Sequence, residues 1–299
     1  MRHRLIPMLL AGLLALAACG DDGSSVGTDG GTNQTTVIPT TVIPSTVTPV
    51  AGTPGPDDLV ALIRYDGGFT TPQNIFTRAP ILAVYGDGRV MTVGAQIAIY
   101  PAPSLTPLQI GKITSAQVIS IIEAAKTAKL DRTIDYGHTN VADDVDTVVQ
   151  VLIGGVTYEH RAYSLHVNGG MADEMLTDQQ RTDRDALAQF IDRAQSIGET
   201  VTGQQLYTPE RYRLHVARAQ ADVGGQQPTD GPTPSVIPWM VDGVTLAATD
   251  CLAVEGTSAA AVREQFSKTN ELTQFSQGID VWEVWIRPVL PHEPTCPTN

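Results

Sequence analysis

A short polar segment near the middle of the chain carries the best set of side chains for metal chemistry. It contains His138, Asn140, Asp143, Asp144 and Asp146. Oxygen-rich loops of this kind can hold Ca²⁺, which takes roughly six to eight oxygen ligands. The EF-hand pattern is absent, because no glycine marks the turn and no glutamate closes the loop. The preferred interpretation is therefore a solvated acidic loop that leads into a strand, with His138, Asp143, Asp144 and Asp146 kept as metal-ligand candidates.

Two histidines offer a second possible metal site. His160 and His166 are six residues apart on a predicted strand over 156–167, so they share one face. At ~3.3 Å per residue they would lie roughly 20 Å apart, too far to bind one ion together. Ordinary sheet-surface histidines are expected instead, and no cofactor is predicted.

The N-terminus carries an export signal. Arg2 and Arg4 precede an apolar run over 5–18 that ends in Leu16-Ala17-Ala18-Cys19. The run is too short to cross a hydrocarbon core, which needs about 20 residues. It resembles the bacterial lipobox, which predicts removal of residues 1–18 as a signal peptide and lipid attachment at Cys19. A plain secretory signal cut elsewhere is the alternative. The expected location is extracytoplasmic, anchored to the cell membrane by lipid.

The other two cysteines are Cys251 and Cys296. An even pair outside the cytoplasm is expected to form a disulfide. Two free thiols or a two-ligand metal fragment are the alternatives. A disulfide here would hold the proline-rich C-terminal tail on the folded part.

The elements that position these residues begin after a tether. Residues 19–57 are first rich in Gly, Ser and Asp and then repeat Thr and Val before a proline at every fifth position. Such a segment cannot build a core and is predicted to be disordered, with its second half a semi-rigid spacer.

Strand patterns dominate the rest of the chain. Alternating runs predict hairpins over 81–93 and 145–167, and further strands over 59–65, 212–218 and 281–287. Helices are predicted over 114–130, from Thr177 onward and over 258–268. This order predicts an α+β fold with a mainly antiparallel sheet, hairpins and inserted helices. Two packed subdomains are predicted, 58–203 and 204–299, with one continuous domain as the alternative.

Composition narrows the possible partners. The 299 residues carry a formal net charge of −13, which becomes more negative when Arg2 and Arg4 leave with the signal. So acidic a chain is a poor partner for nucleic acid and for anionic lipid head groups. The membrane, reached through lipidated Cys19, is the one predicted partner; an envelope protein or small ligand stays open.

Local catalytic motifs are missing from the sequence. It contains no Gly-x-Ser-x-Gly elbow, no His-Glu-x-x-His pair and no phosphate-binding Gly-rich loop. A non-catalytic binding or structural role in the cell envelope is therefore expected. The alternatives are an extracytoplasmic hydrolase, whose residues need not be close in sequence, and a solute-binding lipoprotein.

The folded part is similar to a group of uncharacterised exported bacterial lipoproteins. The resemblance lies in Tyr65-Asp66-Gly67-Gly68-Phe69, Tyr85-Gly86-Asp87-Gly88-Arg89-Val90, the stretch from Val156 to Tyr163, and Arg287-Pro288-Val289-Leu290-Pro291. It implies export and a compact C-terminal domain. No activity is known for the group, so it implies no site residues.

Overall fold

The computed structural model describes residues 53–166, 174–219 and 232–297. The predicted signal peptide, Cys19 and the predicted tether up to residue 52 lie outside these ranges. Across the three ranges, no helix is both long enough and apolar enough to cross a membrane.

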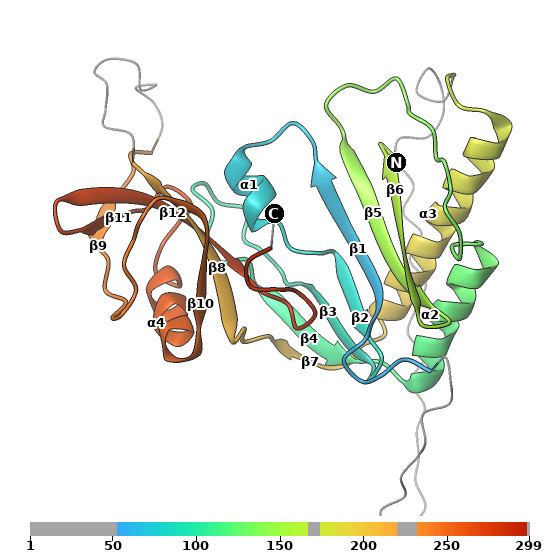
Figure 1. The fold of residues 1–299 in the computed structure, drawn as a ribbon, viewed down its shortest axis with the longest axis horizontal. Helices are drawn as coiled ribbons and strands as arrows, with labels where there is room; N and C mark the ends of the chain where they lie inside the picture. The colour runs from blue at the N-terminus through green and yellow to red at the C-terminus, as the bar shows by residue number, and fades with distance from the viewer. Residues whose placement is uncertain (1–52, 167–173, 220–231, 298–299) are drawn as a thin grey trace, which may run out of the picture. The chain divides into compact units, whose positions relative to one another are not determined.

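A seven-stranded antiparallel sheet is built from residues 59–206 (Figure 1). Its strand order is β6-β5-β1-β2-β3-β4-β7. The strands are β1 Leu59–Gly67, β2 Leu82–Tyr85, β3 Arg89–Val93, β4 Leu108–Lys112, β5 Val145–Ile153, β6 Val156–Tyr163 and β7 Thr202–Leu206.

Glycine turns explain the two predicted hairpins, which are both confirmed. Gly154 and Gly155 join β5 to β6 with φ of 60° and 82°, the left-handed backbone that a tight hairpin turn needs. Gly88 has φ of 83° beside β3. Strand β6 ends at Tyr163, earlier than predicted, and Ser164 follows with φ of 52°.

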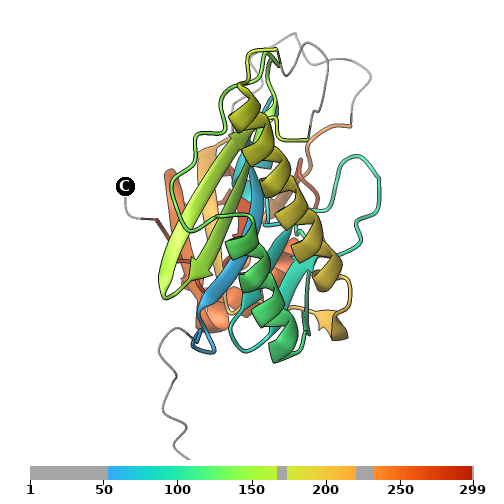
Figure 2. The same cartoon turned by 90° about the vertical axis from the view of Figure 1, so that its right-hand side faces the viewer.

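Two helices, α2 Ser115–Thr127 and α3 Asp178–Gly198, cover one face of this sheet (Figures 1 and 2). Each begins with a capping box, in which a threonine side chain and a glutamine side chain exchange hydrogen bonds with each other's backbone amides. The apolar side chains that repeat at helical spacing face the sheet and form its core. They are Val118, Ile121 and Ala125 of α2, and Leu187, Phe190, Ala194 and Ile197 of α3.

A five-stranded sheet follows, in the order β10-β8-β12-β11-β9. Its strands are β8 Arg211–Arg218, β9 Val236–Pro238, β10 Thr249–Glu255, β11 Gln274–Gln277 and β12 Asp280–Pro288. All pairs are antiparallel except β9 with β11. Helix α4 Gly256–Phe266 packs on one face through Ala259, Val262 and Phe266.

The predicted α+β class with mainly antiparallel sheets is therefore confirmed. Strand β7 completes the first sheet and β8 begins the second, so the change of sheet falls between Leu206 and Arg211. The two predicted subdomains, 58–203 and 204–299, stay a prediction. A short helix, α1 Pro72–Thr77, packs against β12 of the second sheet and so joins the two halves.

The expectation of surface histidines is wrong for His160, which is 2 % exposed on β6. Its Nε2 lies 3.0 Å from the carbonyl oxygen of Leu130, and its Nδ1 lies 2.9 Å from the hydroxyl of Tyr136. Because a carbonyl only accepts, Nε2 carries the proton and donates, and Nδ1 accepts from Tyr136. His166 lies beyond the end of β6 and is not part of the strand.

We predict that stability falls on mild acidification because of His160. Burial lowers its pKa below 6.5 and outweighs the opposing hydrogen bond to Leu130 and the charge of Glu159. The unfolded chain then binds more protons, so stability is lost as pH falls from 6.5 toward the lower folded pKa. NMR titration of the imidazole should give a midpoint below 6.5. The His160→Gln variant should show a shallower decline of unfolding free energy over this window. A midpoint above 6.5 would contradict the assignment.

Candidate functional site

The predicted disulfide between Cys251 and Cys296 is at bonding distance, with Cα atoms 5.8 Å apart. It joins β10 to the C-terminal tail, residues 289–297, which follows β12. In Figure 1 the tail is the dark red loop that leaves β12 and runs toward the first sheet. Its Leu290 packs in a cluster with Leu62 and Tyr85 of the first sheet. The tail is therefore bonded to the second sheet through Cys296 and packs on the first sheet through Leu290.

Three of the four predicted metal-ligand candidates, His138, Asp144 and Asp146, have side-chain partners of their own. His138 stacks on the ring of Tyr163, with centroids 4.5 Å apart. The carbonyl of Asp143 accepts from the amide of Phe69.

The carboxylates of Asp144 and Asp146 have hydrogen-bond or ion-pair partners. Asp144 accepts from the amide of Val145 and lies 3.5 Å from His166, while Asp146 accepts from Arg161 at 3.0 Å. Within the described ranges, no three His, Cys, Asp or Glu side chains form a group that could hold a metal ion. The metal site stays a sequence prediction.

A different pocket, of about 460 Å³, gathers charged side chains from both sheets. Its volume lies in the range of small-molecule sites. We call it the arginine pocket. It is lined by Leu62, Arg64, Tyr65 and Asp66 of β1, Gln150 of β5, Ile75 of α1, Arg78, Ala79 and Pro80 after α1, Arg213 of β8, Arg287 of β12, and His292, Glu293, Pro294 and Pro297 of the tail.

Two arginines face each other at the centre of the pocket wall. Strands β8 and β12 place Arg213 directly opposite Arg287. Glu293 binds Arg287 with both carboxylate oxygens, at 2.7 and 3.0 Å, and accepts from the amide of Leu290. Its Oε2 lies 3.4 Å from an Nη of Arg213. One carboxylate is therefore shared between two guanidinium groups.

Burial and charge act in opposite directions on this group. Burial opposes ionisation of Glu293, but the Arg287 hydrogen bonds and the charges of both arginines outweigh it and lower the pKa of that carboxyl. Burial and the neighbouring Arg287 lower the pKa of Arg213, against the attraction of Glu293. The Nε of Arg213 is buried and has no hydrogen-bond partner. The geometry thus leaves a donor and a positive charge only partly compensated.

The other charged residues of the lining do not neutralise its excess of positive charge. Asp66 is hydrogen-bonded by Arg64 and also by Arg161, at 2.8 Å. Arg78 donates to the carbonyl of Gly67 at 3.0 Å, which neutralises no charge. With four arginines against two carboxylates, the pocket lining is positive in an acidic chain.

His292 closes the side of the pocket near β2. Its Nδ1 lies 2.8 Å from the hydroxyl of Tyr85. Burial and, to a smaller extent, the charge of Arg287 lower the pKa of His292, against the opposing charge of Glu293. The contact with Tyr85 fixes the tail one residue before Glu293.

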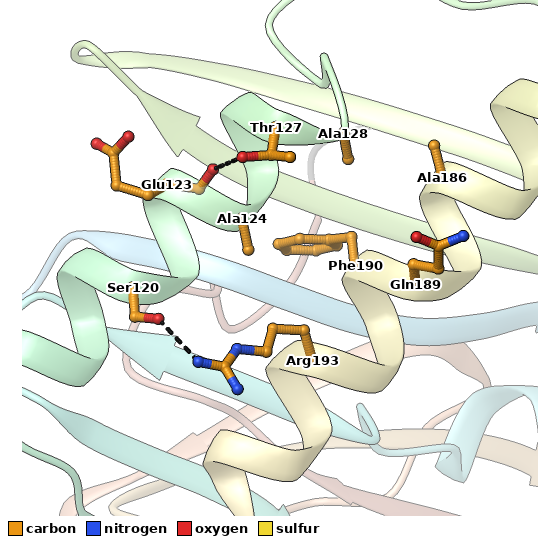
Figure 3. A pocket seen from close by; sticks show the side chains of 9 residues that line it. All are labelled: Ser120, Glu123, Ala124, Thr127, Ala128, Ala186, Gln189, Phe190 and Arg193. Carbon is orange, nitrogen blue, oxygen red and sulfur yellow. Dashed lines mark hydrogen bonds between the residues drawn. The ribbon is translucent and has the colours of Figure 1, made fainter.

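A second hollow of about 420 Å³ lies between α2 and α3 (Figure 3). Phe190 and Ala124 form its apolar floor, and Arg193 reaches across to the hydroxyl of Ser120 at 3.3 Å. The hydroxyl of Thr127 is turned to the carbonyl of Glu123 within its own helix. The Arg193 guanidinium and the Ser120 and Thr127 hydroxyls thus have partners within the two helices. We interpret the hollow as a gap between two packed helices.

The arginine pocket was not predicted from the sequence. Alternation along 211–218 does place Arg213 and His215 on one face of β8, and alternation along 280–288 places Trp285 and Arg287 on one face of β12. His215 and Trp285 do stack, with centroids 4.1 Å apart. Two features could not be inferred from the sequence. One is the strand register that places the two arginines opposite each other, and the other is the path of the tail, which brings Glu293 beside them.

Comparison with known proteins adds no relative: the chain matches no protein-family model, no curated protein and no solved structure. The resemblance to exported bacterial lipoproteins therefore rests on the sequence motifs alone.

We predict that Glu293→Gln destabilises the fold by roughly 3–5 kcal/mol, because it leaves two buried arginines without a carboxylate. Chemical denaturation of the variant and of wild type measures the difference. The control is Glu123→Gln on α2, whose exposed pair with Lys126 should contribute less than about 1 kcal/mol. Equal losses in the two variants would contradict the central place given to Glu293.

Proposed function

We propose that this chain is an exported lipoprotein, held at the cell membrane through lipid on Cys19, with a non-catalytic binding role in the cell envelope. The observation that carries the binding role is the arginine pocket, whose lining gathers four arginines against two carboxylates. Export and anchoring rest on the apolar run over 5–18, the Leu-Ala-Ala-Cys sequence at 16–19 and the tether that follows.

The chemistry of the pocket supports binding more than turnover. Arginine stays charged at every physiological pH, so it holds and orients a ligand and does not exchange protons with it. The carboxylate of Glu293 is ionised and fixed by Arg287, and Nδ1 of His292 is hydrogen-bonded to Tyr85. Both residues thus hold the tail in place, and Asp66 is hydrogen-bonded by Arg64 and Arg161.

The anchor is tested with Cys19→Ser. Without the thiol no lipid is attached, so the protein should appear in the medium or remain as an uncleaved precursor. Membrane and soluble fractions are compared by immunoblot, and the mass of the membrane form is measured. Ser24→Ala, a change in the same N-terminal region that leaves the cysteine, is the control and should stay with the membrane. Membrane retention of unlipidated Cys19→Ser would contradict the proposed anchor.

The non-catalytic role is tested against the hydrolase alternative. The purified chain is assayed with esterase, glycosidase and peptidase substrates, and we expect no turnover above a heat-denatured sample. Turnover that disappears when one polar residue of the arginine pocket is replaced, for example in His292→Ala, would show an enzyme and reject this part of the proposal.

A further inference from the structure

The arginine pair is costly for the fold. Residues directly opposite on antiparallel strands have Cβ atoms about 4.5–5.5 Å apart, and like charges in such positions destabilise a sheet. Arg213 and Arg287 hold this relation, and their side chains are 14 % and 10 % exposed. Two cations are therefore close together and largely shielded from water.

Glu293 compensates only one of them fully. Arg287 donates two hydrogen bonds to the carboxylate and also donates from Nε to the carbonyl of Arg78 at 3.1 Å. Arg213 receives a single ion contact at 3.4 Å, and its Nε has none. A buried donor without a partner costs stability, so folding alone gives no reason for an arginine at this position.

We infer that Arg213 is a ligand-binding residue and that the arginine pocket takes a small molecule with an oxyanion group, a carboxylate or a phosphate, on this guanidinium. The inference rests on the proposed binding function and names the chemistry of its ligand. Glu293 shows how such a group fits, since its own carboxylate occupies the fork of Arg287. Both oxyanions accept the paired donors that a guanidinium presents.

The surroundings favour a small ligand that carries apolar parts as well. The volume of about 460 Å³ suits a metabolite-sized molecule. Leu62, Ile75, Pro80 and Pro294 offer apolar contacts within the same lining. Arg78 supplies a second cation, which donates to the carbonyl of Gly67 and forms no ion pair with a carboxylate in the described part of the chain.

The test compares Arg213→Met with Arg218→Met in the full-length chain, purified in an uncharged detergent. Arg218 lies on the same strand but is 68 % exposed and pairs with Asp280. Binding of inorganic phosphate and of succinate is measured by calorimetry and by the rise in Tm, at constant ionic strength against chloride. We expect wild type and Arg218→Met to bind one or both anions, and Arg213→Met to bind at least tenfold more weakly.

The stability of the unliganded variants provides the second readout. Because Arg213→Met removes the repulsion and the unpartnered donor, its Tm should equal that of wild type or exceed it by about 2–4 °C. Arg213→Lys keeps the charge without the guanidinium fork and should bind more weakly than wild type while remaining folded. Binding of phosphate alone, or of succinate alone, identifies the oxyanion.

Two results would overturn the inference. One is a lower Tm for Arg213→Met with anion binding unchanged, which would make Arg213 a structural residue. The other is a wild-type chain whose Tm and calorimetric signal respond to neither anion. Neither result bears on the lipid anchor, which the Cys19→Ser fractionation tests separately. An error in the inferred ligand chemistry can therefore be distinguished from an error in the proposed anchoring.

Discussion

The carboxylate of Glu293 is a charged contact that connects the tail, the second sheet and the segment leading into the first sheet. It binds Arg287 of β12 and lies beside Arg213 of β8. Arg287 in turn donates to the carbonyl of Arg78, which follows α1 and precedes β2. One carboxylate thus connects the C-terminal tail, the second sheet and the chain that enters the first sheet. Its ionised form is needed, because a buried guanidinium pair without a counter-charge is strongly unfavourable.

Local sequence patterns were enough to predict much of the fold. Glycine turns and two-residue alternation identify the hairpins, and the threonine–glutamine capping boxes set the starts of α2 and α3. The elements that sequence reasoning did not find are short or lie at edges, such as α1, β4, β7 and β9. Strand β7, for example, is exposed throughout and pairs with β4, which lies about ninety residues earlier. Such a strand has no apolar alternation, so only its distant partner defines it.

The candidate site likewise has features that neighbouring residues predict and features that depend on contacts between distant parts of the chain. Pairing of Cys251 with Cys296 follows from counting thiols, and the structure brings them together. The acidic segment around Asp144 suggested metal ligands because the residue types are close in sequence, yet His138, Asp144 and Asp146 each contact a different neighbour. Arg213 and Glu293 are far apart along the chain, and their meeting depends on strand register and on the path of the tail.

The disulfide has a consequence for the thermodynamics of recognition. The tail leaves β12 at Pro288 and is bonded to β10 at Cys296, so the segment that carries His292 and Glu293 is anchored at both ends. A free chain terminus would fray, and ordering it on contact with another molecule would reduce affinity. Here that ordering is completed when the thiols are oxidised. The formed disulfide therefore preorganises this wall of the pocket before any ligand arrives, and an oxidising environment is the condition under which such a bond persists.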